Sequence, residues 1–173
     1  MKTTKKIIIS ILTAFLICFS FEQVQTQAKA KPLAGYIKGS KKKTAGYKAA
    51  LKALTRLHCP YVYGAAHSKK AMKNKHQRKF DCSGLVSWAY AQSGHSIGIR
   101  TSKSCATAGK KIKSLKKAKP GDILTFSRNH RKSGVCHAAI YLGGGLMVHA
   151  PHRHSTVRVA RVQRGLFAIR RIC

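Results

Sequence analysis

Three residues of this 173-residue chain have the types and the spacing for nucleophilic catalysis: Cys82, His137 and His149. Cys82 lies at the predicted start of a helix, where unpaired backbone N–H groups carry partial positive charge and favour thiolate over thiol. The excess of lysine and arginine is expected to lower the thiol pKa further. An isolated cysteine in an exported chain would more often be inert or disulfide-bonded, so the two histidines decide the interpretation.

His137 opens an apolar strand and His149 closes the next one, with three glycines between the strands. If Gly143–Gly145 form a three-residue loop, Ala139 pairs with His149, and His137 becomes the diagonal neighbour of His149 on one sheet face. A two-residue loop would place the histidines on opposite faces. A cysteine, a histidine base and a second polar group that orients the base form a Cys-His-polar triad.

The scarcity of carboxylates excludes other chemistry. The chain has three acidic residues, of which Asp81 and Asp122 follow the first 30 positions. Asp122 follows Pro-Gly and is expected to be a turn residue. Glycoside hydrolysis by two carboxylates and calcium sites built from several carboxylates are therefore not expected. The remaining candidates for catalysis are cysteine, histidine, serine and tyrosine.

Four blocks of sequence, in order, resemble the NlpC/p60 family of cell-wall cysteine peptidases. The blocks are Asp81–Val86 (DCSGLV), Pro120–Phe126 (PGDILTF), His137–Gly143 (HAAIYLG) and Val148–Ala150 (VHA). The resemblance extends over about residues 47–172 and implies a papain-like α+β fold. It also implies that Cys82 attacks an amide carbonyl, that His137 acts as base and then acid, and that His149 orients His137.

The resemblance implies substrate contacts as well. Tyr61 matches a tyrosine near the oxyanion and substrate, and Asp81 and Ser83 match positions that bind the free amine of a peptidoglycan stem peptide. The expected bond is the one from γ-D-glutamate to the diamino acid, either diaminopimelate or lysine. Ala65 stands where a second glycine is common in the family, and the basic stretch after it is long.

The spacing of apolar residues changes along the chain, from helical spacing in the first half to alternation in the second. Apolar residues at helical spacing predict a helix from Tyr47 that stops before Pro60, and a second over residues 81–93 that Asp81 can cap. A third helix is possible over residues 105–115, after a solvated surface loop over residues 65–79. Period-two segments predict strands at 122–127, 136–142, 146–150, 155–162 and 166–172. We therefore expect an α+β domain with helices packed on an antiparallel sheet of about five strands.

The amino terminus is typical of an exported protein. Residues 1–30 combine early lysines, a short apolar run and small residues, which predicts a secretory signal peptide and no membrane span after its removal. Residues 31–46 are expected to be a flexible basic lead-in, and residues 47–173 to be the catalytic domain. Removal of the signal leaves 31 basic and 2 acidic residues, a formal net charge of +29. Such charge predicts attraction to anionic wall polymers and to carboxylate-bearing stem peptides, with a secreted, wall-associated location.

Five cysteines follow the signal segment. If Cys82 is free, the other four can form two disulfides in three pairings: Cys59, Cys105, Cys136 and Cys173. A zinc site from His149, His152 and His154 with Cys136 is disfavoured, and no metal or other cofactor is expected.

Three alternatives remain on sequence grounds. One is a cationic wall- or membrane-binding protein, antimicrobial-like, on an inactive peptidase scaffold, and another is an amidase or acyltransferase of the same fold. Nucleic-acid binding has charge in its favour, but the sequence has no recognition motif and export weighs against it. Loss of activity in Cys82→Ala with retained wall binding would separate the enzyme from the binding protein.

Overall fold

The computed structural model describes residues 33–39 and 44–172. The predicted signal peptide, residues 1–30, and Cys173 lie outside these ranges. No helix within them is long and apolar enough to cross a membrane. Within the segment expected to be a flexible lead-in, Leu33–Tyr36 form a 3-10 helix, η1, and Lys38 N–H donates to Leu142 O at 2.8 Å. This part of the lead-in is thus structured, because Tyr36 and Ile37 pack against the core.

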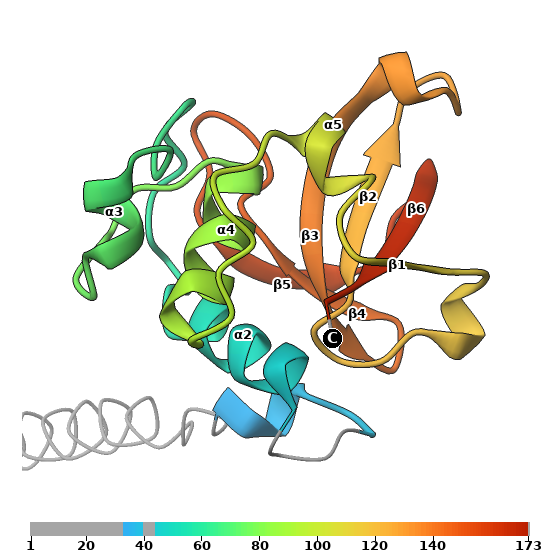
Figure 1. The fold of residues 1–173 in the computed structure, drawn as a ribbon, viewed down its shortest axis with the longest axis horizontal. Helices are drawn as coiled ribbons and strands as arrows, with labels where there is room; N and C mark the ends of the chain where they lie inside the picture. Colours follow the sequence, from blue (N-terminus) through green and yellow to red (C-terminus); the bar gives the residue numbers. More distant parts are fainter. Residues whose placement is uncertain (1–32, 40–43, 173) are drawn as a thin grey trace, which may run out of the picture. The chain divides into compact units, whose positions relative to one another are not determined.

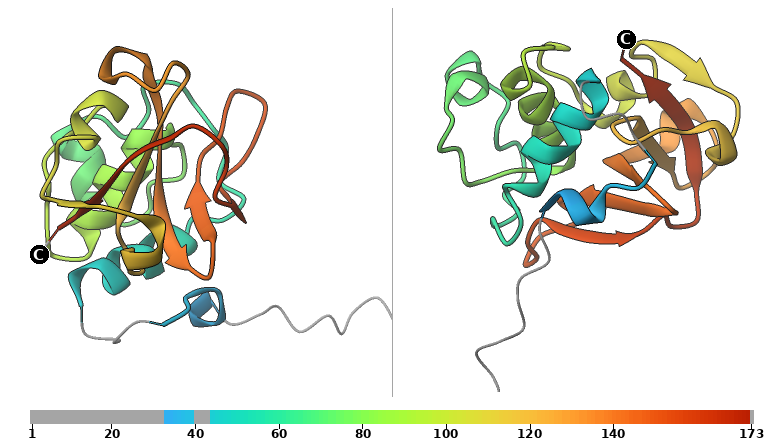
Figure 2. Two further views of the ribbon diagram at one scale, coloured as in Figure 1. Left: turned by 90° about the vertical axis from the view of Figure 1, so that its right-hand side faces the viewer. Right: turned by 90° about the horizontal axis from the view of Figure 1, so that it is seen from below.

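In the described domain α2, α3 and α4 lie on one side of the strands, whereas the short α5 lies beside β3 (Figures 1 and 2). Helix α2 spans Ala45–Leu54 and begins with the Thr44 side chain accepting from Tyr47 N–H. The remaining helices are α3 (Lys69–Lys73), α4 (Cys82–Gln92) and α5 (Ser102–Cys105). Helix α3 interrupts the predicted surface loop because Met72 is buried there.

Helix α4 is the predicted second helix, and it is buried more completely than an amphipathic pattern indicates. Every residue from Cys82 to Tyr90 is buried. A helix that is apolar or small on all sides can be enclosed by neighbours on several faces. Its first turn approaches the preceding loop so closely that a Cβ at Gly84 would lie 2.2 Å from Ala65 O. Glycine at position 84 is what permits this contact.

Six antiparallel strands form one sheet in the order β1-β6-β2-β3-β4-β5. Their bounds are β1 Lys110–Ile112, β2 Ile123–Ser127, β3 Val135–Gly143, β4 Leu146–His149, β5 Arg158–Arg161 and β6 Leu166–Arg171. Short 3-10 turns, η2 (Leu115–Lys117) and η3 (Lys132–Gly134), precede β2 and β3. The α+β class is confirmed, with one strand more than predicted.

The additional strand corrects the possible third helix over residues 105–115. Helix α5 ends at Cys105, and Lys110–Ile112 pair instead with Arg171–Ile169 of β6. Short segments such as this one are ambiguous in local sequence, and here pairing with a distant strand decides the outcome.

The sheet separates two apolar clusters. Ala138, Ile140 and Val148 pack with α2 and α4, whereas Ala139 and Met147 belong to the cluster on the other face. Alternation along β3 and β4 therefore determines which side chains lie on the sheet face that packs against the helices and which lie on the opposite face.

Candidate active site

Cys82 is the first residue of α4, directly after the capping residue Asp81. Its Sγ lies 3.3 Å from Ser102 Oγ of α5, and the backbone amides of Ala138 and Ser83 also hydrogen-bond to the sulfur. Burial raises the pKa of the Cys82 thiol above its ordinary value, and the hydrogen bonds only partly oppose this effect. The expectation of a lowered pKa was wrong for this state, because removal from water outweighs the hydrogen bonds to the sulfur.

His137 and His149 are in direct contact. His137 Nε2 and His149 Nδ1 lie 2.9 Å apart, and the ring planes cross at 71°. The contact follows from the register of β3 and β4, in which Ile140 pairs with Val148, as a three-residue loop requires. The loop itself is Gly144–Gly145, because Gly143 pairs with Leu146, and a bulge between Tyr141 and Gly143 gives the register that a three-residue loop was expected to give. The predicted sharing of one face is confirmed.

Both imidazoles are buried and favour the neutral state. Burial lowers the pKa of His137 to about 3, with the neighbouring His149 adding to the effect. Burial also lowers the pKa of His149 to about 4, with Arg158 the next contribution. The second ring nitrogen of His149, Nε2, is buried and has no hydrogen-bond partner in the part of the chain that the structure describes.

The histidine pair and the thiol are adjacent but not bonded. No hydrogen bond joins Cys82 Sγ to His137 within residues 33–39 and 44–172; the Ala138 amide, one residue beyond His137, provides the link. The His137 ring lies against Phe126, with ring centroids 5.6 Å apart. The resting thiol therefore has Ser102, not His137, as its side-chain partner.

Asp81 organises the other side of the nucleophile. Its Oδ1 accepts from Gly84 N–H at 2.7 Å and from Ser83 Oγ–H at 3.3 Å, and lies 2.9 Å from His67 Nε2. Its Oδ2 accepts from Gly64 N–H at 3.0 Å. One carboxylate thus joins the start of α4 to the loop that follows Tyr61. His67 was not among the predicted site residues. It lies in residues 65–79, for which the sequence predicted only a long, solvated surface loop.

Tyr61, Asp81, Cys82 and Ser83 line one cleft with a volume of about 720 Å³. Burial raises the pKa of Tyr61, with Cys82 and Asp81 the next contributions, so its phenol lies near both groups. His137 and His149 are buried and are not among the residues that line this cleft. The other lining residues are Tyr63, Gly64, His67, Thr101, Ser102, Lys103, Arg128, Val135, Cys136, Pro151, His152 and Arg153.

Ser102 is a further site residue that sequence analysis missed. Thr101 and Ser104 form a reciprocal capping box that starts α5 at Ser102. The sequence contained the pattern of such a box: Thr101 is followed three residues later by Ser104, whose hydroxyl can accept from the Thr101 backbone N–H.

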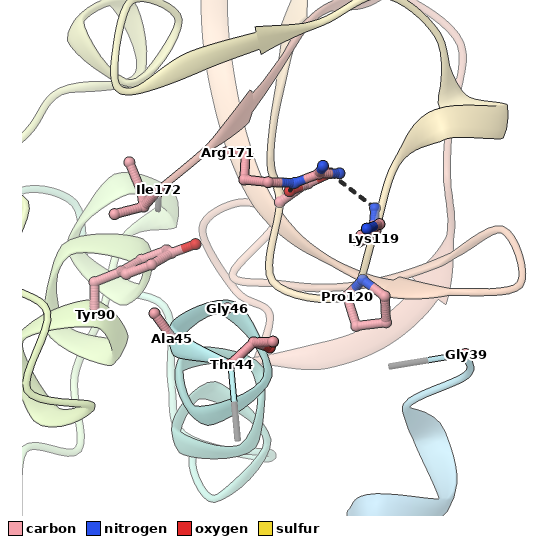
Figure 3. A pocket seen from close by; sticks show the side chains of 10 residues that line it. Gly39, Thr44, Ala45, Gly46, Tyr90, Lys119, Pro120, Arg171 and Ile172 are labelled. Carbon is pink, nitrogen blue, oxygen red and sulfur yellow. Dashed lines mark hydrogen bonds and ion pairs between the residues drawn. The ribbon is translucent and has the colours of Figure 1, made fainter. Parts of the chain in front are cut away.

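A second cavity of about 520 Å³ lies away from this chemistry, between the start of α2, Tyr90 of α4 and Arg171 of β6 (Figure 3). Asp122 lines it, and both its oxygens accept from Arg171, at 2.7 and 2.6 Å. Asp122 Oδ2 also accepts from Lys119 N–H at 2.8 Å, as a turn residue does. None of the predicted catalytic residues reaches this cavity.

All four cysteines within the described ranges are free: Cys59, Cys82, Cys105 and Cys136. Two disulfides among the four candidates would require at least one bond between Cys59, Cys105 and Cys136, so that expectation was wrong. The backbone carbonyl of Cys59 accepts from Val157 N–H, whereas Cys105 is buried on α5. The two cysteines therefore lie on separate elements and do not form a disulfide. Between Leu33 and Gly39 and between Thr44 and Ile172, no group of three metal-ligating side chains comes together.

Comparison with known proteins agrees with this architecture. "Probable endopeptidase Mb2213c" of Mycobacterium bovis is 39% identical over 107 residues, 62% of this chain and 24% of that protein. "Bifunctional muramidase/DL-endopeptidase CwlT" of Bacillus subtilis is 32% identical over 120 residues, 65% of this chain and 33% of its own length. The chain therefore spans a third or less of these two relatives.

A crystal structure of the NlpC/p60 domain of the peptidoglycan hydrolase SagA superposes with a TM-score of 0.59 at 32% identity, covering 73% of this chain and 98% of that domain. The model of the NlpC/P60 family matches residues 58–172, from just before Tyr61 to the end of the sheet. The match includes Cys82, His137 and His149, and the chain belongs to the NlpC/P60 family of cysteine peptidases.

Proposed function

We propose that this protein is a secreted cysteine endopeptidase that hydrolyses peptidoglycan stem peptides between γ-D-glutamate and the diamino acid. The observation that carries the proposal is the His137–His149 hydrogen bond on the strand whose next residue, Ala138, hydrogen-bonds through its amide to the buried Cys82 at a helix start. The names of the relatives, a DL-endopeptidase and a peptidoglycan hydrolase, support the substrate class.

The proposed mechanism assigns the protons of the two histidines in contact. A proton on His137 Nε2 that is donated to His149 Nδ1 leaves His137 Nδ1 unprotonated and able to accept from Cys82. Neutral His149 then carries its own proton on Nε2, the buried nitrogen without a partner. His149 thus acts as a positioning residue that fixes the tautomer and orientation of His137.

The reaction follows from this arrangement. The Cys82 thiol transfers its proton to His137 Nδ1, and the thiolate attacks the amide carbonyl carbon of the stem peptide. The tetrahedral intermediate collapses to a thioester on Cys82, and the departing amine takes the proton from His137. A water molecule, deprotonated by His137, then hydrolyses the thioester and restores the thiol.

Substrate binding must exchange one hydrogen-bond partner of the thiol for another. In the resting state the raised pKa of Cys82 and the lowered pKa of His137 keep both groups neutral. The proposal requires Cys82 to turn from Ser102 toward His137, and hydrogen bonds of this kind commonly tighten only in the substrate complex.

Tyr61, Ser83 and Asp81 are proposed to contact the acyl side of the substrate. Asp81 already accepts from two backbone amides and from Ser83, and contacts His67, so most of its lone pairs are in use. We therefore assign it chiefly a positioning role, with Tyr61 and Ser83 facing the substrate.

The test is digestion of insoluble peptidoglycan, of both diaminopimelate and lysine type, by residues 31–173, followed by mass spectrometry of the released peptides. We expect fragments that end in D-glutamate and fragments that begin with the diamino acid, and neither from Cys82→Ala. Wall binding without cleavage by the wild type would contradict the proposal and favour the cationic binding protein. Cleavage at the bond between the glycan and L-alanine would identify an amidase instead.

A further inference from the structure

The cleft has an excess of positive charge that no carboxylate of the described chain neutralises. The whole sequence has three acidic residues, Glu22, Asp81 and Asp122, and Glu22 lies outside the described ranges. Asp122 is paired with Arg171, and Asp81 is bonded to His67, Ser83 and two amides. The lysine and arginine side chains that line the cleft are Lys103, Arg128 and Arg153, and within the described residues none of them forms an ion pair with a carboxylate.

These charged side chains come from three separate segments of the chain. Lys103 belongs to α5 and follows Ser102, the partner of the nucleophile. Arg128 follows β2 directly, where its backbone N–H donates to Gly134 O. Arg153 belongs to the connection from β4 to β5, and Figure 1 shows α5 beside the upper part of β3. The positive charge of the cleft therefore comes from three separate segments of the chain.

Arg153 is the best-placed of the group. Its guanidinium lies 5.6 Å from the centroid of the Tyr63 ring, a cation–π contact that holds the side chain at the cleft. Its charge also acts on the Tyr61 phenol, which in turn lies near Cys82. Arg153 thus lies on the Tyr61 side of the nucleophile, where the acyl part of the substrate is proposed to bind.

We infer that the substrate supplies the missing carboxylates, and that the cleft distinguishes stem peptides with a free D-glutamate α-carboxylate from those in which it is amidated. The inference rests on the proposed function and names the chemical form of its substrate. Guanidinium groups bind carboxylates through charge-assisted, often bidentate, hydrogen bonds. A neutral amide leaves those cations unpaired once the peptide has displaced water, which penalises the amidated form.

The test compares matched tripeptides, L-alanyl-γ-D-glutamyl-diaminopimelate and its D-isoglutamine counterpart, with a second pair that carries lysine. We expect wild-type kcat/KM to be at least about tenfold higher for the free acid, the size of one charge-assisted hydrogen bond. Arg153→Gln should reduce that preference to about threefold or less by slowing cleavage of the acid alone, and Arg153→Lys should restore part of it. Arg128→Gln should act in the same direction.

Arg164→Gln is the control, since it removes one positive charge from an exposed loop outside the cleft and should leave the preference unchanged. Equal cleavage of acid and amide by the wild type would overturn the inference while leaving the proposed function in place. So would a preference that survives both Arg153→Gln and Arg128→Gln. Cleavage of no peptide and no wall would overturn the proposed function and the inference together.

Discussion

Cys82 is subject to two opposing effects. Burial at the start of α4 raises its pKa, while hydrogen bonds from Ser102 and from the Ala138 and Ser83 amides lower it. In the structure burial is the larger effect, so the resting residue is a thiol. Reactivity must then come from proton transfer to His137 rather than from a thiolate that is present beforehand.

Replacing Ser102 by alanine should raise the Cys82 pKa further, because the side-chain hydrogen bond that lowers it is lost. The pH midpoint of iodoacetamide alkylation at Cys82 should move upward, with slower alkylation at neutral pH. Thr107→Ala, on an exposed hydroxyl just beyond α5, is a control that should not move the midpoint. An unchanged midpoint in Ser102→Ala would show that the 3.3 Å contact does not act on the thiol.

The histidine pair should make stability depend on pH. The folded pKa values of about 3 and about 4 lie below the ordinary 6.5, so the unfolded chain binds more protons in this interval. The free energy of unfolding should therefore fall as the pH falls from about 6.5 toward 4, by about 1.4 kcal/mol per pH unit for each histidine. Urea denaturation at several pH values measures this slope.

His137→Gln should remove about one histidine's share of that slope, whereas His76→Gln, on an exposed loop, should not change it. A slope that is the same in the wild type and in His137→Gln would contradict the assignment of a buried, neutral pair.

Two elements position the site: α4 presents Cys82 at its first residue, and the β3–β4 hairpin brings His137 to His149. The start of α4 could be predicted from sequence because Asp81 is a strong capping residue. The shared face of the two histidines followed only if the loop had three residues, and in the structure the Ile140–Val148 register is reached through a bulge instead. Ser102, His67 and β1 could not be predicted. Ser102 starts a helix of four residues, which is too short to show a periodic pattern, and His67 lies in a loop. Strand β1 exists only because β6 pairs with it.

Asp81→Ala tests the element-level role of that carboxylate. Loss of the Gly84 cap and of the acceptor for Gly64 N–H should lower the free energy of unfolding by at least about 2 kcal/mol. Asp81→Asn keeps an acceptor oxygen and should lose less. Thr44→Ala, which removes the cap of α2, should cost about 1 kcal/mol. If Asp81→Ala were no more destabilising in guanidinium denaturation than Thr44→Ala, the joining role of Asp81 would be contradicted.

At the scale of the whole molecule, charge is the dominant feature. The sequence carries 35 lysine and arginine residues against 3 acidic ones, far more than hydrolysis requires. Such a charge favours association with polyanions and opposes compaction through self-repulsion. We propose that it holds the enzyme on anionic wall polymers, while the cations of the cleft act on the bound peptide.

Binding of residues 31–173 to isolated cell walls should weaken steeply between 0.05 and 0.5 M NaCl, an interval in which the screening length falls from above about 10 Å to well below it. Pull-down with insoluble wall measures the bound fraction. Cys82→Ala should bind as the wild type does, because it changes no basic residue. Binding that is undiminished at high salt would exclude a predominantly electrostatic attachment.

The central claim is that Cys82 forms a covalent acyl intermediate with a stem peptide. Acid quenching of the enzyme during turnover of L-alanyl-γ-D-glutamyl-diaminopimelate, followed by intact-protein and peptide mass spectrometry, tests it directly. The account predicts a mass increase equal to the L-alanyl-γ-D-glutamyl group, located on the peptide that contains Cys82 and absent from Cys82→Ala and His137→Ala. Turnover by Cys82→Ala, or an adduct on another residue, would contradict it.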